Sequence, residues 1–197
     1  SLVGSEMCIR DRPECVSVLT ADTQVKHALG DGEYRKRRES CEGAAGILGI
    51  DSFRDATSAQ VEAAKEELGD LLYRRARHAV SEMQRVEEFS DALRRDQSDR
   101  IANLMRCSHN SLRDDFEVSC EELDVLVDAA YEFGPERGLI GSRMTGGGFG
   151  GSTVSLVKSE AAEALKAYLE KSYQQKFGRE LNCFITSAED GANCESL

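Results

Sequence analysis

Apolar residues in the first two thirds of the chain recur mainly at the spacing of a helix. Between Thr57 and about Phe133 they fall three or four positions apart, which is typical of helices with one buried face. The members of this stripe are Val61, Ala64, Leu68, Leu71, Leu72, Ala76, Ala79, Met83, Val86, Ile101, Leu104, Met105, Leu112, Leu123, Leu126, Val127 and Ala130. The pattern therefore predicts several helices in succession.

Helix starts and one connector divide this region. The segments TSAQ at 57–60 and SCEE at 119–122 both have the spacing of a capping box, in which the first and fourth residues exchange hydrogen bonds. Ser98 is expected to begin another helix, and the polar segment 111–119 is expected to connect two helices. A further helix is expected upstream, marked by four residues at helical spacing, namely Tyr34, Arg38, Cys41 and Ala45. Its expected end is Gly49.

Segments typical of strands flank the helices. CVSVLTADTQ predicts a short strand that ends at Asp22, GLIGSRM and STVSLV predict two strands around a glycine run, and LNCFIT predicts a fourth. Between the last two strands, an amphipathic helix is expected to end at Gly178. Without the helical insertion, the expected order of elements is strand–helix–strand–strand–helix–strand, which is the split arrangement of ferredoxin-like folds. We therefore predict an α+β fold, with an antiparallel sheet of about four strands and a large helical insertion.

Length and charge limit the possible functions. A chain of 197 residues corresponds to one domain or slightly more, and 40% hydrophobic residues are enough to form a core. The formal net charge of −11 disfavours nucleic acid and anionic membranes as partners, although it leaves a small anionic ligand possible. No run of about 18 apolar residues suggests a membrane span.

The cysteines favour a reducing compartment. Their number, seven, is odd, no CxxC motif occurs, and the three histidines lack the spacing of a zinc site. Reduced thiols and a cytoplasmic location are therefore expected. The opening segment SLVGSEMCIRDRP matches no pattern that follows, so residues 1–13 are interpreted as a non-native or unstructured leader, and 14–197 as the domain.

The glycine run is the most distinctive stretch of the sequence. Five of the six residues from Gly146 to Gly151 are glycine, and Phe149 interrupts them. Glycine permits positive φ angles, and successive N–H groups of such a loop can converge on an anion. A flexible hairpin turn is the alternative, and residue types alone leave the two interpretations equally open. The run is neither GxGxxG nor GxxxxGK[ST], so neither a dinucleotide-binding fold nor a P-loop is supported.

Several collinear motifs resemble one enzyme family. GSRMTGGGFGG is similar to the third signature of the GHMP small-molecule kinases, in the form found in galactokinases. HALGDGEYRKRRESCE, ARHAVSEMQRV, SHNSLRDDFEVSCEELD and the terminal DGA also resemble galactokinase segments, in the same order. The resemblance covers residues 14–194. It implies a ferredoxin-like C-terminal domain of a protein that is a cytoplasmic monomer when intact. It also implies transfer of the γ-phosphoryl group of ATP, with Mg²⁺, to the C1 hydroxyl of D-galactose.

The resemblance also implies roles for particular residues. Tyr34 matches a tyrosine that hydrogen-bonds galactose, whereas the alternative is a half-buried tyrosine that packs the helix on the sheet. The segment expected beside the ATP phosphates consists of Thr145, Gly146, Gly147, Gly148, Phe149, Gly150 and Gly151. Other charged residues are expected to be structural: Arg37 and Arg38 pair with acids, Arg143 is a surface residue, Asp114 and Asp115 end a helix, and His27 and His109 are structural or exposed.

Two further signatures of the family are expected nearer its N-terminus, and neither occurs in this sequence. They carry the sugar-binding acids, the loop that wraps the nucleotide and the catalytic aspartate. No catalytic or metal-binding residue is therefore assigned in this chain, which resembles the C-terminal half of a galactokinase and is expected to be inactive alone. Alternatives are a non-catalytic galactokinase-like galactose sensor that regulates transcription, an N-acetylgalactosamine kinase, and a structural domain whose glycine loop binds nothing.

Overall fold

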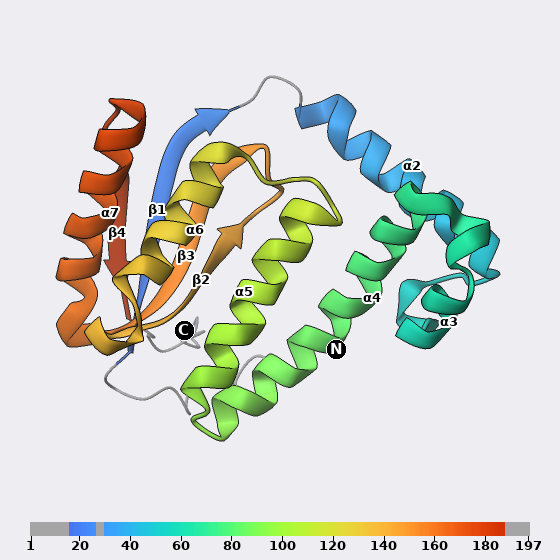
Figure 1. The fold of residues 1–197 in the computed structure, drawn as a ribbon, viewed down its shortest axis with the longest axis horizontal. Helices are drawn as coiled ribbons and strands as arrows, with labels where there is room; N and C mark the ends of the chain where they lie inside the picture. Colours follow the sequence, from blue (N-terminus) through green and yellow to red (C-terminus); the bar gives the residue numbers. More distant parts are fainter. Residues whose placement is uncertain (1–15, 27–29, 188–197) are drawn as a thin grey trace, which may run out of the picture.

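A four-stranded antiparallel sheet forms one side of the molecule (Figure 1). The computed structural model describes residues 16–26 and 30–187, so the interpretations of residues 1–13, of His27 and of the terminal DGA lie outside the described residues. The strands are β1 (Val16–Lys26), β2 (Leu139–Thr145), β3 (Gly150–Lys158) and β4 (Asn182–Thr186), in the order β2-β3-β1-β4. This is the order of a split, ferredoxin-like sheet, which confirms the predicted fold class.

β1 is longer than predicted. It continues past Asp22 to Lys26, and its pairing with β3 is irregular between these two residues. The extra backbone groups find partners nearby: Gln24 N–H donates to the Asp22 carboxylate, Val25 N–H donates to Thr23 Oγ1, and Thr23 donates to the Gly151 carbonyl. The irregularity therefore ends the regular ladder without ending the strand.

Two helices cover one face of the sheet. They are α6 (Glu121–Phe133) and α7 (Ala162–Phe177), and α7 follows the short 3₁₀ turn Ser159–Ala161. Leu19, Ala21 and Val157 point from the strands into the core between sheet and helices, and all three are fully buried. α7 ends before Gly178, whose φ of +66° is the left-handed conformation expected at a helix end.

The helical insertion extends away from the sheet (Figure 1). It consists of α2 (Gly30–Leu48), the 3₁₀ turn Phe53–Asp55, α3 (Ser58–Ala63), α4 (Lys65–Arg94) and α5 (Ser98–Asp114). α5 packs against β2, while α2, α3 and the first half of α4 form a separate apolar cluster around Ala44, Val61 and Ala76. A last 3₁₀ turn, Pro135–Arg137, leads from α6 into β2.

The buried stripe of α4 differs from the predicted one. Leu71, Met83 and Val86 are exposed, with relative accessibilities of 47%, 38% and 69%. Gly69 interrupts the helix with a φ of +64° and a ψ of 172°, so the residues after it are rotated relative to those before it. After Gly69, the buried apolar residues of α4 in this cluster are Tyr73, Ala76 and Val80.

One predicted capping box is confirmed and the other is wrong. At Thr57, the side chain accepts from Gln60 N–H and the Gln60 side chain accepts from Thr57 N–H. At the start of α6, however, the capping position is Cys120, and no side chain caps the helix. Ser119 donates instead to the Asp124 carboxylate at 2.5 Å, which removes it from the predicted box.

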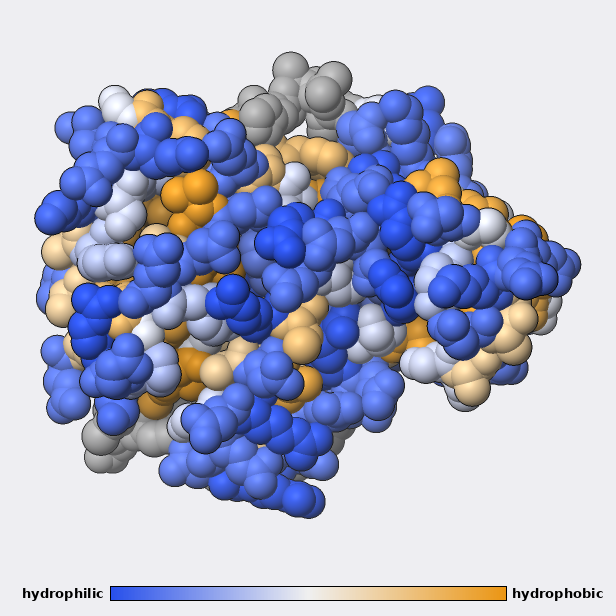
Figure 2. Space-filling model, in the orientation of Figure 1, coloured by the Kyte–Doolittle hydropathy of each residue, from blue (hydrophilic) through white to orange (hydrophobic). Residues whose placement is uncertain are grey.

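The surface agrees with the acidic, polar composition. Hydrophilic side chains cover most of the face in Figure 2, and apolar side chains appear there as separate small patches. Among the residues described, no helix is both long enough and apolar enough to cross a membrane.

Candidate functional site

The glycine run forms the turn between β2 and β3. Positive φ angles occur at Gly146 (+83°), Gly148 (+83°), Gly150 (+118°) and Gly151 (+87°), but not at Gly147. Phe149 also has a positive φ, +58°, which is strained for a bulky residue and persists only where surrounding structure holds it. The turn is therefore a defined conformation and differs from a flexible linker.

One side of the turn is fixed by the connector between α5 and α6. Phe149 N–H donates to the Val118 carbonyl at 2.7 Å, and the Phe149 ring packs beside a cluster that includes Leu112 and Met144. A Cβ added at Gly148 would lie 2.2 Å from the Val118 carbonyl oxygen. Only glycine fits at 148, because both the backbone angle and the close approach exclude a side chain.

The other side of the turn faces outward. Thr145, Gly146 and Gly147 are exposed, and a Cβ added at Gly146 or Gly147 would meet no atom within 4 Å. Within the described residues, no acceptor is present for the N–H groups of Gly146, Gly147 and Gly148. Successive free N–H groups with alternating φ signs are the arrangement that binds anionic oxygens, so this edge has the chemistry for phosphate.

Tyr34 lies on α2 and points into solvent. Its relative accessibility is 68%, so the interpretation as a half-buried packing residue is wrong. The role in binding a sugar stays a prediction, and the exposed phenol is available for it. Arg38, on the same predicted face, is likewise exposed and pairs with Glu42 at 2.8 Å, as expected.

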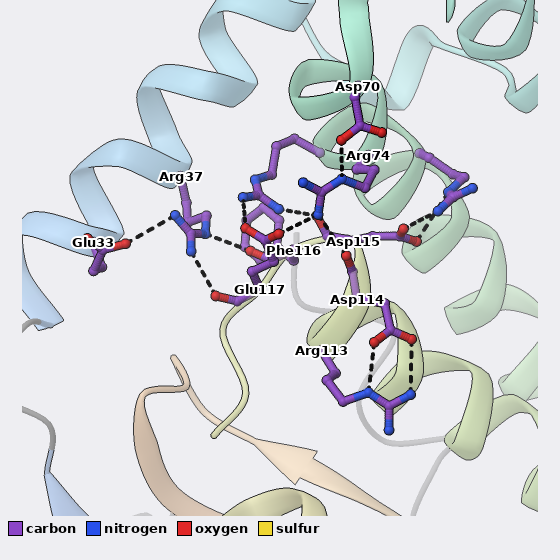
Figure 3. A network of polar contacts seen from close by, with 11 residues as sticks. Glu33, Arg37, Asp70, Arg74, Arg113, Asp114, Asp115, Phe116 and Glu117 are labelled. Carbon is purple, nitrogen blue, oxygen red and sulfur yellow. Dashed lines mark hydrogen bonds and ion pairs between the residues drawn. The ribbon is translucent and has the colours of Figure 1, made fainter. Parts of the chain in front are cut away.

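Arg37 joins the helix of Tyr34 to the glycine turn. Its Nε donates to the Phe116 carbonyl at 2.6 Å, and another guanidinium nitrogen donates to the Glu117 carbonyl at 2.8 Å (Figure 3). It also pairs with Glu33 at 3.3 Å, and its guanidinium carbon lies 5.7 Å from the centre of the Phe149 ring. Pairing with an acid was predicted, but the contacts with carbonyl groups were not, since no residue spacing in the sequence marks them.

The acidic residues of the connector are engaged by arginines from α4 and α5. Asp114 pairs with Arg113 at 2.8 Å, and the Asp115 carboxylate accepts from Ser111 at 3.0 Å and from Arg77. These contacts at the end of α5 confirm the structural interpretation of both aspartates.

Glu117 is the third acid of the connector. Its carboxylate accepts from Arg74 and from Arg75, and these two hydrogen bonds lower the pKa of Glu117 to about 2. The carboxylate is therefore ionised at neutral pH and bound to the guanidinium groups, which makes it part of the framework that holds the connector.

The described residues contain no set of three ligands for Mg²⁺. The part of the chain that the structure describes contains no group of three histidine, cysteine, aspartate or glutamate residues that could hold a metal ion. His109 is buried and structural: its Nδ1 accepts from Met144 N–H at 3.3 Å, and its Nε2 lies 3.2 Å from the Asp124 carboxylate without hydrogen-bond geometry.

Arg143 contacts its own strand, where its Nε donates to the Met144 carbonyl at 2.9 Å. It lines a groove of about 360 Å³ between α4, α5, β2 and β3, where its guanidinium lies 3.7 Å from the Glu82 carboxylate. Burial lowers the pKa of Arg143, and Glu82 opposes that change. Arg143 is therefore a half-buried residue of the groove, whereas a surface residue was expected.

Comparison with known proteins agrees with this geometry. Residues 79–175 match the family model "GHMP kinases C terminal". This chain carries the C-terminal domain of the GHMP kinases. Within that family it is similar to galactokinases: 42% identical to that of Bos taurus over 177 residues, and 40% identical to that of Glaesserella parasuis over 182.

The matches cover most of this chain and less than half of each relative. They span 90% and 91% of the chain but 43% and 47% of the bovine and Glaesserella galactokinases. The crystal structure of Lactococcus lactis galactokinase complexed with galactose matches with a TM-score of 0.80 and 28% identity, over 86% of this chain and 44% of that one. The GHMP kinase domain described here thus has a galactokinase-like fold.

Proposed function

We propose that this domain is part of a galactokinase, which transfers the γ-phosphoryl group of ATP to the C1 hydroxyl of D-galactose. The observation that carries the proposal is the likeness to the Lactococcus lactis galactokinase complexed with galactose, with its TM-score of 0.80. The identity of 42% to the bovine galactokinase supports it. Because the chain spans 43% of that relative, the activity is proposed for the protein that contains this domain.

Two parts of the described structure suit this reaction. We propose that the N–H groups of Gly146, Gly147 and Gly148 contact the terminal phosphates of ATP, since none of them has an acceptor among the described residues and the first two of these glycines are exposed. Thr145, Gly150 and Gly151 shape the turn, and Phe149 anchors it. Tyr34 donates to or accepts from a galactose hydroxyl.

Phosphoryl transfer also requires Mg²⁺ and a group that positions or deprotonates the sugar hydroxyl. When bound, Mg²⁺ supplies neutralisation of the phosphate charge. The described residues lack a set of three ligands for it. We propose that the metal ligands and the catalytic acid or base come from outside these residues, and that this chain alone does not turn over.

We also propose a cytoplasmic monomer that binds neither nucleic acid nor membrane. The net charge of −11 supports this, because it repels both kinds of polyanionic surface. The cysteines Cys41, Cys107, Cys120 and Cys183 are free thiols, which suits a reducing compartment.

A chimera tests the proposed activity. The C-terminal part of human galactokinase, to which the chain is 42% identical over 177 residues, is replaced by this chain. ADP release is measured with and without galactose. We expect release that depends on galactose, whereas this chain alone gives none. A chimera that is folded by circular dichroism and inactive with galactose contradicts the proposal.

The role of Tyr34 has its own test in the chimera. Tyr34→Phe removes one hydrogen bond to the sugar, so the KM for galactose should rise about tenfold, while the KM for ATP stays unchanged. Tyr168→Phe is the matched control, because the one contact of its hydroxyl among the described residues is a long one, 3.4 Å to Glu132. Equal KM values for the two variants would exclude Tyr34 from the sugar site.

A further inference from the structure

We infer that Arg37 is a positioning residue, which fixes the glycine turn relative to the helix that carries Tyr34. The inference rests on the proposed function, because it assumes that the turn and Tyr34 serve one reaction. Its structural basis is the connector between α5 and α6, whose last residues lie against the turn.

Four successive carbonyl groups, from the end of α5 into the connector, accept hydrogen bonds from arginines. The carbonyl groups of Asp114 and Asp115 accept from Arg74 and Arg75, and those of Phe116 and Glu117 accept from Arg37 (Figure 3). These carbonyls belong to the end of α5 and to a segment outside the helices and strands, so they need partners from elsewhere. Glu117 itself has a φ of +55°, which such contacts must maintain.

Short hydrogen bonds link α2 to the connector and the connector to the turn. Arg37 reaches the Phe116 and Glu117 carbonyls at 2.6 and 2.8 Å, and the Val118 carbonyl, one residue further, accepts from Phe149 N–H at 2.7 Å. Tyr34 lies three residues before Arg37 on the same helix. A shift of the connector would therefore move the turn relative to the sugar-binding helix.

Arg37 differs from the other arginines of the connector in the element it comes from. Arg74 and Arg75 project from α4, whereas Arg37 projects from α2. Its side chain is only 12% exposed, and its planar guanidinium donates to two neighbouring carbonyl groups at once, which a lysine ammonium does less well. Arg38, the next residue, is 73% exposed and, within the described ranges, pairs with Glu42 alone, so it provides a matched control.

Hydrogen exchange of the 197-residue chain tests the connection without any ligand. Arg37→Met should speed exchange of the Phe149 amide about tenfold, because Val118 is no longer held in place, while Arg38→Met should leave it unchanged. Arg37→Lys, which keeps the charge and can reach one carbonyl, should give an intermediate rate. If Arg37→Met does not fold, the Arg37→Lys variant alone tests the inference. A Phe149 amide that exchanges at the wild-type rate in a folded Arg37 variant overturns the inference.

The galactokinase chimera tests the consequence for the reaction. Arg37→Met should lower kcat about tenfold and change the KM for galactose little, since Tyr34 is still present but the turn is displaced. Arg37→Lys should recover part of the loss, which a residue needed only for stability would not show at a temperature where both variants are folded. An inactive wild-type chimera contradicts the proposed function and leaves the exchange result to decide the inference. An active one with unchanged kcat in Arg37→Met contradicts the inference alone.

Discussion

At the scale of single residues, neighbouring glycines of the turn have different roles. Gly148 is enclosed, with the Val118 carbonyl where a Cβ would be, and its φ of +83° is unfavourable for other residues. Gly147 is exposed, lacks a positive φ and has open space around it. Gly148 is therefore required by the fold, whereas Gly147 leaves room for a ligand.

Alanine substitutions separate these roles. Gly148→Ala should destabilise the chain by about 2–4 kcal/mol, because the added Cβ and the backbone angle both force a shift. Gly147→Ala should change stability by less than about 0.5 kcal/mol, yet raise the KM for ATP in the chimera by covering the free N–H groups. Urea unfolding and ADP release measure the two effects. Similar losses of stability for both variants would show that the turn is structural throughout.

The sequence could predict the turn but not which glycine does what. The run itself is visible as composition, and the two strands around it are visible as β-branched segments. The partner of Gly148, Val118, is 30 positions away, and its contact is made by a backbone carbonyl that every residue has. For the same reason Arg37 could not be recognised, since carbonyl groups leave no mark on residue spacing.

At the scale of elements, predictions were correct where the local sequence determines the structure, and wrong where contacts with other residues determine it. The ends of helices at Gly49 and Gly178 were predicted correctly, because both residues adopt the left-handed conformation that glycine favours. The stripe of α4 was confirmed at Ala76 but wrong at Leu71, Met83 and Val86, since the φ of +64° at Gly69 changes which side chains face inward. The second capping box was wrong because Cys120, one residue later, occupies the capping position, and Ser119 donates to the Asp124 carboxylate instead.

The confirmed capping box gives a prediction for the short helix α3. Thr57→Ala removes the side chain that accepts from Gln60 N–H at 3.3 Å, and should destabilise the chain by about 1 kcal/mol. Ser58→Ala is the control, because Ser58 is exposed and follows the cap. Thermal unfolding compares the two. If Ser58→Ala were as destabilising as Thr57→Ala, the loss could not be assigned to the capping hydrogen bonds of Thr57.

At the scale of the whole molecule, the order of helices and strands along the chain was enough to predict the fold class. That order is the one found in split, ferredoxin-like folds, and the strand order β2-β3-β1-β4 agrees with it. The packing of α4 against α5 within the helical insertion could not be predicted. α4 and α5 meet through buried polar groups, including Arg75, which is 1% exposed, and His78, which is 7% exposed. Apolar periodicity cannot locate such residues, since polar side chains are expected at the surface.

His78 makes the stability of the molecule depend on pH. It is buried between α4 and α5, where its Nδ1 lies 3.0 Å from the Ser111 hydroxyl and its ring stacks on Phe116 at 4.4 Å. Burial lowers the pKa of His78 to about 4; the charges of Glu82 and Asp115 oppose this change, and those of Arg85 and Arg143 add to it. The folded protein therefore keeps the imidazole neutral at pH values where the unfolded chain, with a pKa near 6.5, binds a proton.

Stability should consequently fall as the pH decreases from about 6.5 to 4, by about 3 kcal/mol from this group, and should not depend on it above pH 7. His78→Gln keeps a neutral polar side chain and removes the titration, so its unfolding free energy should decrease less over this interval. Urea unfolding of both proteins at pH 7, 6, 5 and 4 measures the difference. Glu117, whose folded pKa is about 2, loses its contribution between about pH 4.5 and 2 in both proteins alike, so the difference between wild type and His78→Gln does not contain it. Parallel pH profiles for wild type and His78→Gln would show that His78 takes up its proton in the folded protein as readily as in the unfolded chain.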